Sequence, residues 1–556
     1  MIKVGLIVDD GVVTELVYDL IKKSKGSSNY EVTTFVVQSN RAQNVSLFKR
    51  SIQYIKQKGL KKFISRLSWA LVCRIDQLAL KKSEKFKNHT RNYHLDNIEI
   101  PKIYVNPKIS KSGYAHRFDD DDLVKLKNEQ LDVLVRCGSG ILRGDILSIC
   151  AFGVISFHHA NNDMNRGGPP GFWEVFNREK STGFIIQRLL GELDCGDVIF
   201  QGRIATVPIY SLNQATLFRK ANFFMHKVLD DLGRKEELPL IKNKKPYAFP
   251  LYTMPTIREQ LSYIFLKTVP FVFRKLLDKF ILMKSWRWGV AYQFVENWKS
   301  AVLWRSKVIK NPPNRYLADP FIWTKDGTTV CYVEDYDYKI GKGHISAYKL
   351  ERGGYTALGT VLSEKFHLSY PFIFDCEGDL YMCPETNESG DIRLYKCVNF
   401  PTGWIYHKTL MDNVNTVDTN IFKYDSKWWL FTNIDSSDLG DYGSELHIFY
   451  SDSMDSDEWI PHSNNPVIFN SECARNGGLI IEEGAIFRVY QRQGFGMYGE
   501  SMGVAMIEKL TEDDYKEVQI FDIPPKFFRG IGGTHTFSYK GGVLALDFVK
   551  RERYSV

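Results

Sequence analysis

The stretch of sequence that decides the fold of the N-terminal half runs over residues 153–201 and reads GVISFHHANNDMNRGGPPGFWEVFNREKSTGFIIQRLLGELDCGDVIFQ. GVISFHH is a short apolar run that predicts a buried strand with His158 and His159 at its end. NRGGPPG predicts a loop in which Arg166 and the glycines hold an anionic or planar ligand. TGFIIQRL and LDCGDVIFQ predict two strands joined by a tight loop that carries Asp194. A histidine at a strand end and an aspartate 36 residues later can form an acid–base pair.

The chain before this stretch alternates between predicted strands and helices. Alternation of this kind predicts a mainly parallel sheet, in which ligands bind beyond the carboxyl ends of the strands. The expected strands cover 3–10, 30–38, 101–107 and 131–137, and the expected helices cover 14–24 and residues near 120–129. The basic segment 47–85 has the periodicity of an amphipathic helix pair on the domain surface, with contact to a membrane surface as the alternative.

The linked motifs of residues 153–201 resemble the 10-formyl-tetrahydrofolate-dependent formyltransferases. The pattern of that family is Asn-x-His at a strand end, Arg-Gly before a proline and an aromatic residue, Thr-Gly, and Leu-Asp-x-Gly. The matching residues are His158, Arg166-Gly167, Pro169, Trp173, Thr182-Gly183 and Leu193-Asp194-Cys195-Gly196. Ser156 stands where the family has its asparagine. The resemblance covers about residues 1–210 and implies an α/β Rossmann-like formyltransferase domain.

The resemblance also implies a cofactor, 10-formyl-tetrahydrofolate, and a set of roles. His158 would support the oxyanion or shuttle a proton, and Asp194 would orient His158 and accept the proton of the amine. Ser156, as a shorter donor than asparagine, would stabilise the oxyanion in part, with Asn161 or Asn162 as alternatives. The cofactor-binding residues would be Gly138, Ser139, Gly140, Ile141 and Leu142, whose loop contacts the folate head group through its backbone, and Arg166 with Gly167. From the residues alone, the 138–142 loop is equally compatible with a plain strand-to-helix turn.

The C-terminal half contains an internal repeat of an apolar strand, a turn and a second apolar strand. Its copies are LADPFIWTKDGTTVCYVE (317–334), LSYPFIFDCEGDLYMCPE (368–385), TVDTNIFKYDSKWWLFTN (416–433), CARNGGLIIEEGAIFRVYQ (473–491) and GTHTFSYKGGVLALDF (533–548). Five copies, each completed by further strands, predict an all-β five-bladed propeller. Asp326-Gly327 and Glu377-Gly378 are expected as hairpin turns because glycine accepts a positive φ.

Polar residues begin the first strand of each copy, and in an innermost strand they point into the central channel. The expected ligand-binding residues are Asp319, Tyr370, Asp418, Arg475 and His535, with Glu334, Glu385, Asn433 and Gln491 at the ends of the second strands. Acids, an arginine and a histidine around one channel predict a carbohydrate or anionic-ligand site. The alternative is that these polar residues cap the blades through hydrogen bonds.

The segments ADPFI and SYPFIF…YMCPET resemble the propellers of arabinanase- and xylosidase-like glycoside hydrolases, and more closely a propeller domain attached to some glycosyltransferases. By this resemblance Asp319 takes the place of the general base. Tyr370 stands where those hydrolases carry an aspartate, so sugar binding is expected in place of hydrolysis.

Length and composition set the outer limits. With 556 residues, two or three domains are expected, here 1–210 as the catalytic domain, 211–284 as a helical junction and 285–556 as the propeller. The net charge of +8 is spread over the chain and gives no indication of nucleic-acid binding. Nine cysteines without regular spacing and a start without a basic segment predict a cytoplasmic location and no metal site. The apolar segment 258–283 is interrupted by charges and is expected as packed helices with at most peripheral membrane contact.

These features together predict a formyltransferase that acts on the amine of an amino sugar, nucleotide-linked, in the synthesis of a surface polysaccharide. Transfer to methionyl-tRNA is disfavoured because the resembled family ends in a small barrel. The alternative is a catalytically degraded formyltransferase fold that serves a glycan-binding or glycosidase-like propeller. Folate binding separates these two hypotheses.

Overall fold

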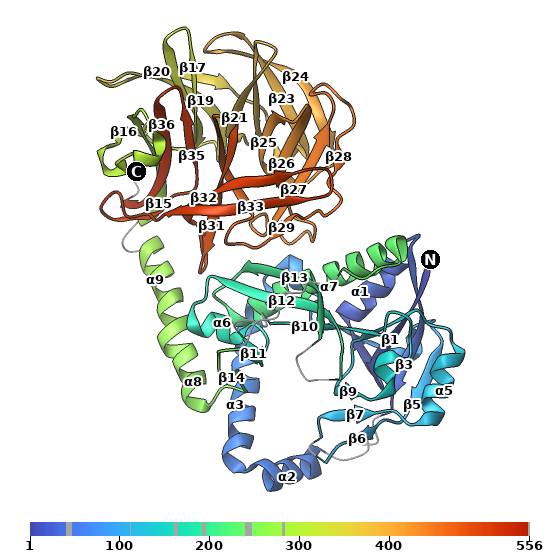
Figure 1. Cartoon of the computed structure of the whole chain (residues 1–556). Helices are drawn as coiled ribbons and strands as arrows, with labels where there is room; N and C mark the ends of the chain where they lie inside the picture. The colour runs from blue at the N-terminus through green and yellow to red at the C-terminus, as the bar shows by residue number, and fades with distance from the viewer. Residues whose placement is uncertain are drawn as a thin grey trace. The chain divides into compact units, whose positions relative to one another are not determined.

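A computed structural model describes residues 1–39, 47–111, 113–160, 165–191, 196–239, 247–280 and 284–553. Asp194, Asn161 and Asn162 lie outside the described residues. The chain divides into two compact units, unit 1 (Met1–Pro270) and unit 2 (Phe271–Val556), which Figure 1 colours from blue to green and from green to red. The segment 211–284, expected as a junction, is shared between the two units.

Unit 1 is built on a seven-stranded sheet in the order β13-β12-β10-β8-β1-β3-β5. Its strands are β1 (Ile2–Asp9), β3 (Tyr30–Gln38), β5 (Lys102–Val105), β8 (Val133–Arg136), β10 (Val154–His158), β12 (Ser181–Arg188) and β13 (Asp197–Ala205). The five strands from β10 to β5 are parallel, and β12 and β13 continue the sheet antiparallel at one edge. The chain leaves β1 toward β3 on one side and later returns to β8 on the other, and ligands bind at the carboxyl ends next to such a change of direction.

Helices cover this sheet, as Figure 1 shows. The helices of unit 1 are α1 (Glu15–Ser24), α2 (Leu47–Lys58), α3 (Leu60–Asp76), α4 (Leu78–Lys81), α5 (Asp120–Asn128), α6 (Phe172–Asn177), α7 (Tyr210–Lys235) and α8 (Ile257–Ser262), followed by a π-helix, η5 (Tyr263–Thr268). Helix α7 lies at the start of the segment 211–284, which was expected as a helical junction, and packs on α1, β12 and β13. Helix α9 (Val269–Phe280) continues from η5 across the division between the units.

Short strands complete unit 1. They are β2 (Val12–Thr14) with β4 (Asn92–His94), β6 (Lys108–Ile109) with β7 (Ala115–Arg117) and β9 (Ile141–Arg143), and β11 (Arg166–Gly167) with β14 (Leu251–Tyr252). Gly167 is required in β11: its φ is +114°, and a Cβ there would lie 1.9 Å from the carbonyl oxygen of Tyr252. The glycine of the Arg-Gly motif therefore permits a close approach of two backbones.

The described strands of unit 2 form five antiparallel sheets. Four of them follow the chain: β17 (Arg315–Lys325) to β20 (Tyr355–Leu362), β21 (Ser369–Cys376) to β24 (Gly403–Asp412), β25 (Thr416–Tyr424) to β29 (Ile468–Phe469), and β30 (Arg475–Glu482) to β33 (Tyr515–Ile523). The fifth sheet joins β15 (Lys284–Phe294) and β16 (Lys307–Ile309) to β34 (Ile531–Gly533), β35 (Phe537–Lys540) and β36 (Val543–Arg553). The beginning and end of unit 2 are thus held together in one sheet.

The first strands of the repeats contact one another in a closed ring, β17, β21, β25, β30 and β35, so the arrangement is propeller-like (Figure 1). Each repeat turns through two consecutive residues of positive φ, which is the two-residue hairpin geometry that suits twisted strands. These pairs are Asp326-Gly327, Glu377-Gly378, Asp425-Ser426, Glu483-Gly484 and Gly541-Gly542. The turns expected at the first two pairs are present.

Candidate functional site

A pocket opens at the carboxyl ends of β8 and β10 in unit 1. These strands are parallel neighbours, with Ser156 paired to Arg136, so their last residues meet at one edge of the sheet. The pocket has a volume of about 100 Å³ and is lined by Arg136, Ile141, Leu142, Arg143, Ser156, Phe157, His158, Gln187, Leu189, Leu190 and Gly196. Four of the residues expected from the sequence, Ser156, His158, Ile141 and Leu142, are therefore together.

Arg136 is a pocket residue that the sequence reading missed. Its Nη1 donates to Ser156 Oγ at 3.3 Å and its Nε to the carbonyl oxygen of Gly140 at 2.8 Å. Burial lowers the pKa of the Arg136 guanidinium, against the opposing effects of Cys137 and Asp9. A half-buried guanidinium that lines a pocket is a strong donor for an anionic group. Its position as the last residue of a strand before a glycine loop could have marked it.

The two histidines of the SFHH motif have different environments. His158 lies in the pocket lining, whereas the ring of His159 packs against Phe157 and Phe218 with centroid separations of 5.3 Å and 4.1 Å. Burial, and then the neighbouring His158 and Arg136, lower the pKa of His159 to about 3. His159 is therefore a neutral packing residue, whereas His158 is the histidine that lines the pocket.

The glycine-containing loop 138–142 reaches the pocket through its second half. The amide and hydroxyl of Ser139 donate to the carboxylate of Asp9 at distances between 2.9 and 3.2 Å. The side chain of Gln38 donates to the Ser139 carbonyl oxygen at 3.1 Å. A Cβ on Gly140 would lie 2.4 Å from the ring of His116, so only glycine fits there. Gly138, Ser139 and Gly140 thus shape the loop, and Ile141 and Leu142 line the pocket.

The remaining expected residues of unit 1 lie elsewhere or outside the description. Arg166 stacks on the ring of Tyr247 at 4.6 Å and is absent from the described lining of the pocket. Gly167 makes the close backbone approach to Tyr252. Asp194 belongs to the undescribed residues 192–195, whose neighbour Gly196 lines the pocket.

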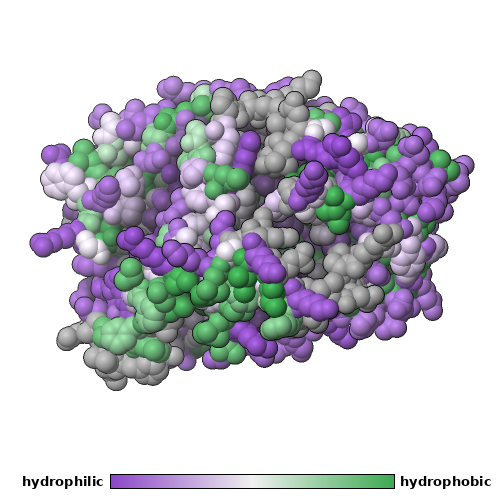
Figure 2. All heavy atoms as spheres, turned by 90° about the horizontal axis from the view of Figure 1, so that it is seen from below, coloured by the Kyte–Doolittle hydropathy of each residue, from purple (hydrophilic) through white to green (hydrophobic). Residues whose placement is uncertain are grey.

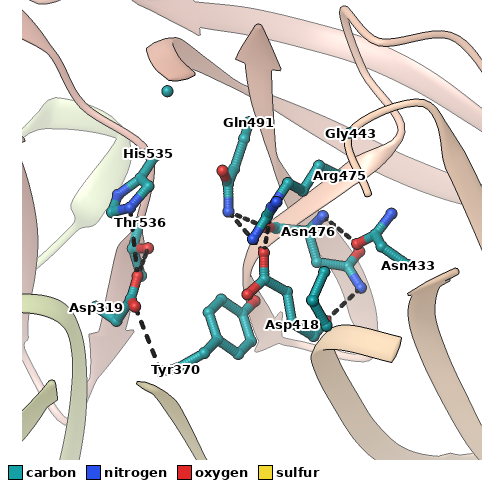
Figure 3. A network of polar contacts seen from close by, with 12 residues as sticks. Asp319, Tyr370, Asp418, Asn433, Gly443, Arg475, Asn476, Gln491, His535 and Thr536 are labelled. Carbon is teal, nitrogen blue, oxygen red and sulfur yellow. Dashed lines mark hydrogen bonds and ion pairs between the residues drawn. The ribbon is translucent and has the colours of Figure 1, made fainter. Parts of the chain in front are cut away.

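A second cluster of expected residues lies at the centre of unit 2. Figure 3 shows these side chains pointing toward one another from the first strands of different sheets. Asp418 accepts from Arg475 Nε at 2.6 Å and from Gln491 Nε2 at 2.9 Å. Asp319 accepts from the hydroxyl of Thr536 at 2.7 Å and from the amide of Tyr370 at 3.3 Å. The polar residues of the predicted channel therefore lie in two hydrogen-bonded groups, one around Asp418 and one around Asp319.

The strand register explains how these residues converge. Ala318, Ser369 and Val417 pair with Glu334, Glu385 and Asn433, and each is followed by a bulge at a residue of positive φ: Asp319, Tyr370 and Asp418. A bulge turns the following side chain out of the strand's regular alternation. In the fourth repeat Arg475 pairs with Gln491, so Asn476, not Arg475, takes the place of those three residues. Arg475, the residue before Asn476, donates to Asp418.

His535 occupies an aromatic and acidic corner of the cluster. Its ring stacks on Trp288 at 3.9 Å and meets Tyr498 edge-on at 5.2 Å. Its Nδ1 pairs with Asp547, and its Nε2 lies 3.7 Å from Asp319. Burial lowers the pKa of His535, but Asp547 and Asp319 outweigh burial and raise the pKa above 6.5. Trp288, Tyr498 and Asp547 were not expected from the sequence. For the fifth repeat the sequence pattern predicted a single channel residue, His535.

Three acids of the cluster, Glu334, Glu385 and Asp319, have raised pKa values. Burial, followed by the Asp319 charge, holds the pKa of Glu334 well above 4.5. Burial and Asp418 do the same for Glu385, against the opposing charge of Arg475. Burial raises the pKa of Asp319 to about 6, with His535 acting in the opposite direction. These carboxyl groups can therefore act as hydrogen-bond donors as well as acceptors.

Asp319, His535 and Asp547 also form a group whose ligand atoms lie within 4.8 Å of one another. Oxygen and imidazole donors of this kind suit a divalent cation. The sequence gave no metal-ligand spacing because the three residues come from distant parts of the chain. His535 and Asp547 also contact each other directly, so the three side chains can lie close together without a metal between them.

Comparisons with known proteins find different relatives for the N-terminal and C-terminal regions of the chain. The family model described as glucosamine inositolphosphorylceramide transferase 1, N-terminal, matches residues 264–526. The protein of that name from Oryza sativa subsp. japonica is 37% identical over 217 residues, which are 37% of this chain and 28% of the rice protein. A methionyl-tRNA formyltransferase from Malacoplasma penetrans is 30% identical over 154 residues, 26% of this chain and 48% of that enzyme. The chain thus spans less than half the length of these relatives.

Two solved structures also match parts of the chain. Glycinamide ribonucleotide transformylase 1 from Symbiobacterium toebii matches with a TM-score of 0.28 and 11% identity, over 42% of this chain and 89% of that chain. The catalytic domain of a Coprinopsis cinerea α-L-arabinofuranosidase matches with a TM-score of 0.32 and 11% identity, over 48% of this chain and 97% of that chain.

The chain is therefore similar to formyltransferases in its N-terminal region and to a transferase family in its C-terminal region. The formyltransferase resemblance drawn from the residue motifs is supported. The similarity to glucosamine inositolphosphorylceramide transferase 1 was not predicted by name. The sequence motifs indicated only a propeller domain attached to some glycosyltransferases. None of the described helices is long and apolar enough to span a membrane.

Proposed function

We propose that the chain transfers a formyl group from 10-formyl-tetrahydrofolate to the amine of an amino sugar, nucleotide-linked, in the synthesis of a surface polysaccharide. In this proposal the five sheets of unit 2 are the blades of a five-bladed propeller that binds the sugar or its glycan. The observation that carries the proposal is the pocket with Ser156, His158 and Arg136 at the carboxyl ends of β8 and β10. It lies in a unit with formyltransferase relatives.

The pocket has the two kinds of surface that a folate requires. Ile141, Leu142 and Leu189 offer apolar walls for a flat ring, while Arg136 and Arg143 offer positive charge. Most small-molecule sites combine such apolar walls with a few placed polar groups. These residues would hold 10-formyl-tetrahydrofolate, which supplies the formyl carbon when bound.

The chain's own residues would then move a proton and stabilise charge. His158, at the pocket edge of β10, is positioned to take the proton of the attacking amine or to donate to the formyl oxygen. Arg136 brings a guanidinium into the region where the family has its asparagine amide. Ser156 is buried and its hydroxyl donates to the Phe157 carbonyl oxygen at 3.1 Å, so it serves Arg136 as an acceptor. Arg136 is thus the better donor for the developing negative charge.

The acceptor is inferred from unit 2. Its relatives carry glucosamine in their name, and the centre of unit 2 places aromatic rings next to acids. Sugars present apolar C–H faces to rings and hydroxyls to carboxyl groups, and a free amine is attracted to acids. Trp288 and Tyr498 supply rings, and Asp319 and Glu385 supply acids. This combination supports an amino sugar in preference to a tRNA.

A release assay tests the proposal. The full chain is incubated with 10-formyl-tetrahydrofolate and a panel of nucleotide-linked amino sugars, and release of tetrahydrofolate is followed. We expect amine-dependent release, and we expect Arg136→Gln to slow it by about 10²–10³-fold. The control Arg143→Gln changes the other pocket arginine and should affect cofactor affinity more than the maximal rate. Equal maximal rates in wild type and Arg136→Gln would refute the role of Arg136.

A second function has an observation in its favour. The amide of Ser139 already donates to Asp9, and the hydroxyl of Ser156 already donates to the backbone. Two groups expected to serve the cofactor or the oxyanion are thereby engaged, which favours a degraded formyltransferase fold that serves a glycan-binding propeller. Calorimetry with a folate analogue separates the two, because the degraded fold would show no binding.

A further inference from the structure

Helices α3 and α8 of unit 1 pack against each other through polar side chains. Gln260 Nε2 donates to the carbonyl oxygen of Ser65 at 2.9 Å, and Ser68 Oγ donates to Gln260 Oε1 at 2.6 Å. Tyr263, at the start of η5, donates to Asp76 Oδ1 at 3.0 Å. Gln260 and Tyr263 are almost fully buried. The seam between the two helices is therefore hydrogen-bonded.

Many apolar side chains of the same helices face outward, although α3 also buries Trp69 and Val72. On α3 and the start of α4 they recur at spacings of three and four residues, which places them on one helical face. Leu67, Leu71 and Phe265 are 57%, 61% and 61% exposed. The outward set, here called the apolar stripe, is Leu60, Ile64, Leu67, Leu71, Ile75 and Leu78 with Ile257, Leu261, Phe265 and Leu266. Figure 2 shows apolar side chains gathered on the face seen from below, with hydrophilic side chains at their border.

A water-soluble helix pair buries its apolar faces and leaves its polar faces solvated, whereas α3 and α8 leave a second apolar face, the stripe, exposed. A contiguous exposed apolar surface of this kind marks an interaction site. Apolar side chains outside and hydrogen-bonded polar groups inside suit the acyl boundary of a bilayer, because its hydrocarbon offers no hydrogen bonds. The stripe therefore needs an apolar environment.

The charges beside the stripe decide which environment fits. Lys61, Lys62 and Arg74 on α3 are exposed, as is Arg258 on α8. The acids of the two helices are engaged within unit 1: Asp76 accepts from Tyr263 and from the amide of Ser211, and Glu259 accepts from Thr256 at the start of α8. The border of the stripe is thus basic without exposed acids to match it.

We propose that the apolar stripe docks unit 1 onto an anionic membrane surface, with the leucines in the acyl boundary and the basic side chains at the headgroups. A second copy of the chain fits less well, because a two-fold contact would bring the same basic borders face to face. Helices that lie in the interface need not span it, and none of the described helices does. A formyltransferase held at a membrane would meet acceptors carried on lipids.

Vesicle sedimentation of the full chain tests this docking. We expect binding to vesicles of equal parts phosphatidylcholine and phosphatidylserine, and much weaker binding to phosphatidylcholine alone. Leu67→Ser with Leu71→Ser should weaken binding by about tenfold or more. Lys61→Gln with Lys62→Gln should weaken it by about fivefold per lysine, on anionic vesicles only.

Two matched controls accompany these variants. Val398→Ser with Ile405→Ser removes equally exposed apolar side chains from unit 2, and Lys25→Gln with Lys127→Gln removes the same charge from other elements of unit 1. Both controls should bind vesicles like wild type, and circular dichroism should show the same fold in all four variants. Wild-type binding by Leu67→Ser/Leu71→Ser would overturn the proposal. So would a stripe-dependent dimer, seen by light scattering, that binds no vesicles.

Discussion

The pocket of unit 1 and the centre of unit 2 are both clusters of polar residues at strand ends, but they differ in how the polar groups are used. At the centre of unit 2, Arg475 and Gln491 both donate to Asp418, and Asp319 accepts from Thr536 and from the amide of Tyr370. In unit 1, Arg136 and His158 line an open volume of about 100 Å³. The polar groups of unit 1 thus line a pocket, whereas those at the centre of unit 2 are buried and hydrogen-bonded within the protein.

The largest effect is expected from His158. His158→Ala should reduce formyl transfer by about 10²–10⁴-fold, because a positioned proton-transfer group is lost. The neighbouring His159→Phe is the matched control, since His159 is neutral and packed between Phe157 and Phe218. Rates measured by tetrahydrofolate release should separate the two variants. Similar losses in both would mean that the strand end matters only for folding.

In unit 2 the largest expected effect is on the free energy of unfolding, and in free-energy terms it is similar in size to the loss of rate in His158→Ala. Asp418→Ala leaves the buried Arg475 without its partner, which should cost about 3–5 kcal/mol. Urea unfolding followed by tryptophan fluorescence reports mainly on unit 2, because only Trp69 and Trp173 of the 11 tryptophans belong to unit 1. Asp425→Ala, in a hairpin turn, is the control for a lost aspartate. A change below about 1 kcal/mol in Asp418→Ala would show that the network is not a structural unit.

The pH dependence of stability sharpens the comparison. The pKa of Asp319 is raised from 3.8 to about 6, so the folded state holds a proton that the unfolded state has lost. Asp319 therefore contributes to the free energy of unfolding at pH values below its pKa in the unfolded chain, and this contribution is lost as the pH rises through about 4 to 6. Its size is on the order of 1 kcal/mol per unit of pKa shift. The difference in unfolding free energy between wild type and Asp319→Asn should change over this window. A pH-independent difference would argue for an ionised Asp319 in both states.

The smallest effect is expected at Ser156. If Arg136 is the main donor, Ser156→Ala should slow transfer only several-fold, because the guanidinium keeps its bond to the Gly140 carbonyl oxygen. Ser156→Asn should maintain or raise the rate by restoring an amide. Steady-state kinetics at saturating cofactor would measure both. A loss in Ser156→Ala as large as that in Arg136→Gln would make the serine the primary donor.

The parts of the fold that depend on local pattern could be predicted from the sequence. The strand at 30–38 was predicted with the bounds of β3, and the 15-residue interval from Asp319 to Glu334 spans the β17–β18 hairpin. These features depend on apolar periodicity and on turn residues such as Asp326-Gly327, which act within a few residues. The helices expected over 258–283 are present as α8, η5 and α9 as far as the structure describes the segment, to residue 280.

The features that were missed depend on pairing between distant segments. Arg136 reaches the pocket only because β8 pairs with β10, and Asp547 meets His535 only through the fifth sheet. Asn476, not Arg475, corresponds to Asp319, Tyr370 and Asp418, because Arg475 pairs with Gln491 as Ala318 pairs with Glu334. The outward stripe of α3 was visible as periodicity, but the periodicity alone did not show which face is buried.

The most direct measurement of the central claim is mass spectrometry of an amino sugar after reaction with isotope-labelled 10-formyl-tetrahydrofolate. The proposed function predicts that the wild-type chain transfers the labelled formyl group to the amine, and that His158→Ala does not, although it still binds a folate analogue. Absence of label on every amino sugar tested, together with absence of folate-analogue binding to the wild-type chain, would contradict formyl transfer and leave unit 1 as a degraded formyltransferase fold.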